Sequence, residues 1–124
     1  MFGKFGLAVA AVLISAAPAM AQSVCGGAPI PPAAVDGSKV TEAQMKDAHD
    51  DVVNFIKASD DYQSCLFADL KMQKMEANKN KKPFPSSIED AVNQKVKDNQ
   101  TEKEKVGGEY NAAAIIYKKK HPGG

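Results

Sequence analysis

The sequence predicts an all-α protein, a two-helix antiparallel hairpin with an extended Pro-rich N-terminal arm that is tied back by a disulfide. Three observations predict this fold. Apolar residues recur at helical spacing in two long segments, a Pro-Phe-Pro turn separates those segments, and two cysteines stand far apart in the chain. The 124 residues are enough for one domain at most.

The first 21 residues are typical of a cleavable signal peptide. Lys4 supplies a positive charge, residues 5–17 are apolar, and Ala19 and Ala21 form the small-x-small pattern of a cleavage site. Cleavage there leaves Gln22 as the first mature residue. A retained membrane anchor is disfavoured, because the apolar run is shorter than the roughly 20 residues that span a bilayer. We therefore expect a periplasmic or secreted protein without a stable membrane anchor.

Cys25 and Cys65 are the only cysteines. In an oxidising compartment the default interpretation is a structural disulfide. A redox-active pair or a thiolate metal site is disfavoured, because the sequence has neither a CxxC motif nor a cluster of further ligands.

Residues 22–40 form the predicted arm, in which three prolines and three glycines follow Cys25 without a helical period. The helical hairpin is predicted over residues 41–120. Its first helix, about 41–78, begins at a capping box formed by Thr41 and Gln44. The apolar residues that give this helix its period are Met45, Ala48, Val52, Phe55, Ile56, Tyr62, Leu66 and Leu70.

Pro83 and Pro85 end the first helix and form the turn of the hairpin. A second capping box is predicted at Ser86 and Glu89, followed by a second helix over about 86–119 and a tail at 121–124. Gly107-Gly108 predicts either a kink or a close backbone contact within that helix. Asn99 and Lys103 interrupt its apolar pattern. Its apolar residues are Ile88, Val92, Val96, Val106, Tyr110, Ala113, Ala114 and Tyr117.

The charges favour antiparallel, coiled-coil-like pairing of the two helices. Residues 36–69 carry eight acids and three lysines, whereas residues 71–124 carry seven acids and twelve lysines. Pairing then places the acidic start of the first helix beside the lysine-rich end of the second. The chain has no arginine, and its mature net charge is close to zero, so nucleic acid is not an expected partner.

The strongest candidates for chemistry are His49 and its neighbours Asp47, Asp50 and Asp51. We interpret them as a solvated acidic face near a helix N-terminus, with no metal and no cofactor. An enzyme would have to be built on His49, but no nucleophile motif accompanies it. No catalytic residue is therefore predicted.

The turn of the hairpin is rich in lysine and is a possible surface-binding tip. Its residues are Lys71, Lys74, Lys79, Lys81, Lys82 and Phe84. Such a tip suits an anionic surface or a protein client. The alternative is a helix C-terminus that carries cations because the helix dipole favours them there.

The segment Val40-Thr41-Glu42-Ala43-Gln44 resembles the LTxxQ motif of small helical periplasmic chaperones that respond to envelope stress. Val40 replaces the Leu, and the second copy of the motif found in that family is missing. As a whole the chain resembles small exported alphaproteobacterial proteins of unknown function. The resemblance implies an envelope compartment and no specific activity.

Together these observations predict a non-enzymatic periplasmic helical interaction module that binds protein or envelope surfaces. A homodimer is a possible form, because two helices and an arm bury little and a second copy completes a four-helix bundle. The alternative is a small-ligand or metal-binding periplasmic protein. That protein would use the space between arm and hairpin, with the acidic face from Asp47 to Asp51 as the entrance.

Overall fold

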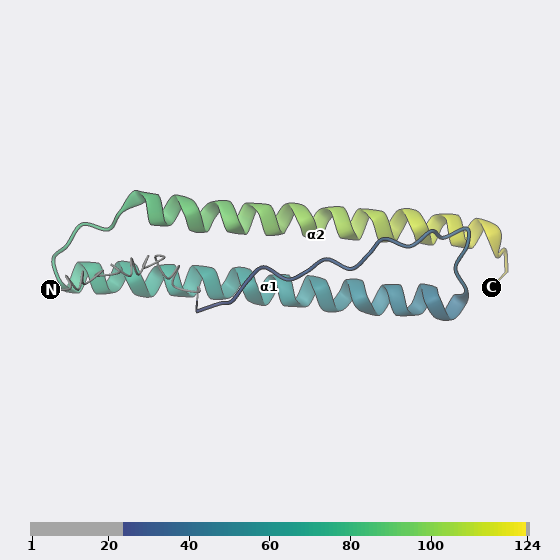
Figure 1. Ribbon diagram of the computed structural model, residues 1–124, viewed down its shortest axis with the longest axis horizontal. Helices are drawn as coiled ribbons and strands as arrows, with labels where there is room; N and C mark the ends of the chain where they lie inside the picture. Colours follow the sequence, from purple (N-terminus) through teal and green to yellow (C-terminus); the bar gives the residue numbers. More distant parts are fainter. Residues whose placement is uncertain (1–23, 124) are drawn as a thin grey trace, which may run out of the picture.

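The computed structural model describes residues 24–123, which form two long helices and an extended arm. Helices α1 (Glu42–Lys79) and α2 (Ser86–Lys120) lie side by side and antiparallel, and the arm runs along them (Figure 1). The predicted all-α hairpin with a disulfide-tied arm is confirmed. The predicted signal peptide, with Ala19, Ala21 and Gln22, lies outside the described residues, as does Gly124 of the tail.

The capping box predicted at the start of α1 is present. The Gln44 amide donates to Thr41 Oγ1 at 3.2 Å, and the Thr41 amide donates to Gln44 Oε1 at 2.9 Å. Each side chain therefore satisfies a backbone donor that the first turn leaves without a helical partner. At the other end, Asn80 caps α1, and Lys81 adopts a φ of 52° as the chain turns towards Pro83.

The second capping box predicted at Ser86 and Glu89 is wrong. Pro85 is the N-cap of α2 and makes no side-chain hydrogen bond. Its φ of −64° already suits the approach to a helix, so the helix begins without a capping hydroxyl. Glu89 lies within α2, and its Oε1 is 2.6 Å from Nζ of Lys74 on α1. The carboxylate that was expected to cap α2 instead joins the two helices.

The close backbone contact considered for Gly107-Gly108 is also wrong. Helix α2 continues through both glycines, and a Cβ atom on either would meet nothing within 4 Å. The close approach occurs at Gly37 in the arm, where a Cβ would stand 2.0 Å from the carbonyl oxygen of Ala113. Gly37 is buried, so the arm packs directly on the backbone of α2.

The core is a narrow row of side chains between the helices, to which α1 contributes most. Among the described residues, its buried apolar side chains are Met45, Phe55, Tyr62, Leu66, Leu70, Val106 and Ala113. Two polar side chains interrupt the row, Ser59 and Asn99, and each is less than 5 % exposed. Asn99 donates to Ser59 Oγ at 3.2 Å and accepts from Gln63 Nε2 at 2.8 Å. This polar layer is therefore internally satisfied.

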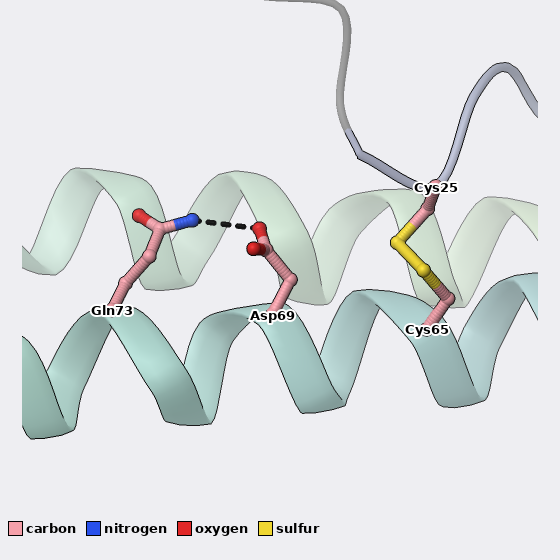
Figure 2. Close-up of a disulfide and its surroundings, with 4 residues drawn as sticks. All are labelled: Cys25, Cys65, Asp69 and Gln73. Carbon is pink, nitrogen blue, oxygen red and sulfur yellow. Dashed lines mark hydrogen bonds between the residues drawn. A yellow bond between two sulfur atoms is a disulfide. The ribbon is translucent and has the colours of Figure 1, made fainter.

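The disulfide between Cys25 and Cys65 ties the start of the arm to α1 (Figure 2). Cys65 lies in the half of α1 that leads to the hairpin turn. From there the arm runs back towards the first turn of α1, antiparallel to that helix (Figure 1). Asp69 and Gln73 follow Cys65 along α1 towards the hairpin turn (Figure 2). The Gln73 side-chain amide donates a 2.7 Å hydrogen bond to Asp69 Oδ2. The arm is thus attached covalently at one end and packed through Gly37 at the other.

Candidate functional site

A pocket of about 260 Å³ lies between the arm, the first turns of α1 and the facing part of α2. We call it the arm pocket. Its walls are mostly apolar, and its polar lining comes from Gln44, Tyr110 and three carboxylates. The arm supplies Pro32, Ala33, Ala34, Val35 and Val40; α1 supplies Gln44, Asp47, Ala48, Asp51 and Val52; α2 supplies Val106, Glu109 and Tyr110.

The residues of the predicted acidic face, Asp47 to Asp51, lie in two different places in the structure. Asp47 and Asp51, one helical turn apart, line the arm pocket together with Glu109 of α2. Asp50 instead faces His49, whose Nδ1 is 3.4 Å from Asp50 Oδ1. The His49 ring also meets Tyr110 edge to face, with ring centroids 5.6 Å apart. His49 is exposed and lies outside the arm pocket.

Within residues 24–123, no group of three or more His, Cys, Asp or Glu side chains is placed to hold a metal ion. The arm pocket occupies the space between arm and hairpin, and the exposed Asp47 and Asp51 are among its lining residues.

The second candidate surface lies on α1, where three exposed apolar side chains stand on the same side of the helix as two lysines. We call it the Phe67 face, and its residues are Val53, Phe67, Lys71, Lys74 and Met75. Phe67 follows Cys65 by two positions and so lies about 200° further around the helix, on the side away from the arm. Val53, Phe67 and Met75 are 49 %, 47 % and 62 % exposed. Lys71 and Lys74 border a shallow hollow beside Phe67 and Met75.

The structure brings together part of the lysine-rich tip. Lys74 pairs with Glu89, and its Nζ lies 6.0 Å from the centre of the Phe84 ring. Lys71 lies beside the same hollow as Lys74, on the Phe67 face. Lys79 ends α1, and Lys81 and Lys82 lie in the turn that follows. The tip is thus a small apolar surface bordered by lysines, one of which is already paired.

Two residues of the arm pocket, Glu109 and Tyr110, were not anticipated as site residues. Both stand about 60 positions from Asp47 and Asp51, so only the register of the two helices brings them together. Sequence periodicity placed Tyr110 among the apolar residues of the second helix, but it gave no indication of the register.

No protein-family model, curated protein or solved structure matches the chain. Within the described residues, neither helix combines the length and apolar character that a membrane crossing requires.

Proposed function

We propose that this protein is a non-enzymatic helical interaction module of the periplasm or the extracellular space, and that it binds a second copy of itself through the Phe67 face. The observation that carries the proposal is the exposure of Val53, Phe67 and Met75 on the side of α1 that the arm leaves uncovered. Apolar side chains that recur along one face of a helix are typical of helix-packing surfaces. The Cys25–Cys65 disulfide supports an oxidising compartment.

The charge along α1 favours a second copy as the partner. Residues 42–61 carry six acids and two lysines, whereas residues 62–82 carry two acids and five lysines. Two α1 helices that pack antiparallel about a two-fold axis place the acidic half of each beside the basic half of the other. Such a pair of hairpins completes a four-helix bundle, which adds a second layer to the narrow core.

Sedimentation equilibrium over a concentration series, with the protein purified without reductant, tests this proposal. We expect a dimer that weakens as salt is added, because screening reduces the attraction between the charged halves. Phe67→Glu should give a monomer that keeps the helical circular dichroism of the wild type and melts at a lower temperature, because the dimer no longer stabilises the fold. Ile115→Glu, which changes a 56 % exposed apolar residue on α2, is the matched control and should leave the dimer intact.

A protein that stays monomeric at every concentration would overturn the proposal, as would a Phe67→Glu variant that dimerises like the wild type. Co-sedimentation with phosphatidylglycerol vesicles tests the alternative that the Phe67 face binds an anionic membrane surface instead of a second copy. Binding to these vesicles without self-association would assign the Phe67 face to an anionic membrane surface and would contradict the proposal.

A further inference from the structure

We propose that the arm pocket binds a small organic cation, an ammonium group carried on a compact apolar body. This inference is independent of the proposed function, because the arm pocket and the Phe67 face share no residue. It is based on the shape of the pocket, its apolar walls and the sign of the charge at its edge.

The pocket is a half-open space formed by three separate elements, and its arm wall is anchored at two points. Four of the five arm residues in this wall, at positions 32–35, stand between the disulfide at Cys25 and the buried contact of Gly37 with α2, and Val40 follows Gly37. A wall anchored at two points loses little conformational entropy when a ligand binds. The volume, about 260 Å³, is just below the range of roughly 300–1,000 Å³ for drug-sized ligands. The pocket therefore suits a ligand of few heavy atoms.

The apolar walls of the pocket favour the apolar body of a ligand, and the carboxylates favour its ammonium group. Ala48, Val52 and Val106 offer apolar surface, and Tyr110 adds an aromatic ring that can pack against a cation or an apolar group. The three carboxylates at the edge, Asp47, Asp51 and Glu109, favour positive charge, and no lysine lines the pocket.

These carboxylates are available to a ligand. Within the described part of the chain, the ion pairs use the carboxylates of Asp36, Asp50, Asp60 and Glu89. Asp47 and Asp51 also repel each other across one helical turn, and a bound ammonium group removes that repulsion. An inorganic cation would leave the apolar walls unused, whereas an organic cation contacts both features.

NMR titration of the isotopically labelled, oxidised protein tests the inference, with benzylammonium and the equally sized neutral benzyl alcohol as probes. We expect benzylammonium to shift the amide signals of Ala33, Ala34, Val35 and Tyr110 in a saturable manner. Benzyl alcohol should bind about fivefold more weakly or not at all, because it does not attract the carboxylates. Equal binding of both probes, or shifts that are not centred on the arm pocket, would overturn the inference.

Two pairs of variants separate the contributions of charge and shape. Asp51→Asn should weaken benzylammonium binding about fivefold, whereas Asp61→Asn, an exposed acid of α1 outside the pocket, should have no effect. Ala48→Leu fills the pocket and should abolish binding, whereas the exposed Ala58→Leu should not.

Undiminished binding in Asp51→Asn or in Ala48→Leu would contradict the proposed site. Displacement of benzylammonium by calcium chloride at an equal concentration would show a site for any cation, and would also overturn it.

Discussion

Gly37 shows how a single small residue positions the arm on the hairpin. Its missing side chain lets the arm lie on the backbone of α2, where a Cβ would stand 2.8 Å from the carbonyl carbon of Ala113 and 3.1 Å from the Tyr117 nitrogen. The φ of Gly37 is not in the left-handed region, so glycine is required here by space rather than by backbone conformation. This contact sets one end of the arm pocket wall.

Gly37→Ala should therefore lower the free energy of unfolding by about 1–3 kcal/mol, because the added methyl group overlaps backbone atoms that cannot rotate away. Urea unfolding monitored by circular dichroism measures the change. Gly108→Ala is the control, since its Cβ meets nothing within 4 Å. That substitution should raise stability by up to about 1 kcal/mol through helix propensity. Equal effects of the two variants would show that the arm does not pack as described.

Gly37 lies within a local turn, closed by a 3.0 Å hydrogen bond from the Lys39 amide to the Asp36 carbonyl oxygen, that precedes α1. The Ser38 hydroxyl and amide both donate to Asp36 Oδ1, at 2.6 and 2.9 Å. These hydrogen bonds favour the ionised carboxylate and hold the pKa of Asp36 below its ordinary value of 3.8. Because Asp36 is exposed, this turn organises the chain before Thr41 without making the whole fold strongly dependent on pH.

At the scale of the elements, the two helices show what the sequence predicts well and what it does not. The start of α1 could be predicted because its cap is formed by residues three positions apart, Thr41 and Gln44. The capping box predicted at the start of α2 is absent, because Glu89 accepts a hydrogen bond from Lys74, which is 15 positions away in the sequence. Sequence pattern captures contacts within one or two turns and misses partners brought together by the fold.

The same limit applies to the centre of the hairpin and to the arm pocket. Asn99 and Lys103 appeared as interruptions of an apolar period, but Asn99 bonds to Ser59 and Lys103 pairs with Asp60 across the helices. The space between arm and hairpin could be anticipated, because the disulfide returns the arm along α1. The contributions of Glu109 and Tyr110 could not, because they depend on the register of α2.

The disulfide is the main attachment of the arm as an element. Residues 26–35 make no backbone hydrogen bond to other described residues, so packing and the disulfide hold them in place. Replacing both cysteines with serine should lower the free energy of unfolding, by up to about 4 kcal/mol for a sequence separation of 40 residues. Paired urea unfolding of the oxidised wild type and the double variant measures this loss.

Heteronuclear 15N NOE measurements on the two proteins then distinguish local from global effects of the cysteine substitutions. Amides of the arm should become mobile on the ps–ns timescale while those of α1 and α2 stay rigid, because the hairpin keeps its own core. Thr41→Ala, which removes the cap of α1 but not the arm attachment, is the control and should lower stability by only about 1 kcal/mol. An arm that remains rigid without the disulfide would contradict the described role of Cys25.

At the scale of the whole molecule, a narrow apolar core leaves the register of the two helices weakly specified. Similar apolar side chains repeat along each helix, so sliding one helix against the other preserves many contacts. The polar layer of Ser59, Gln63 and Asn99 is satisfied only in the observed register. The ion pairs between Lys74 and Glu89 and between Lys103 and Asp60 are formed in the same register.

We predict that the polar layer specifies a single register of the two helices more than it stabilises the fold. Asn99→Ala alone should lower stability by about 1–2 kcal/mol, because Ser59 and Gln63 lose a buried partner. The double variant Ser59→Ala/Asn99→Leu removes the two buried polar side chains of the layer and should regain that loss, since the core becomes continuously apolar and the half-buried Gln63 keeps its bond to Gln100. Its amide NMR spectrum should nevertheless contain additional or broadened signals from helices in more than one register. A double variant with a single set of sharp signals would show that the ion pairs and the tethered arm fix the register without the polar layer.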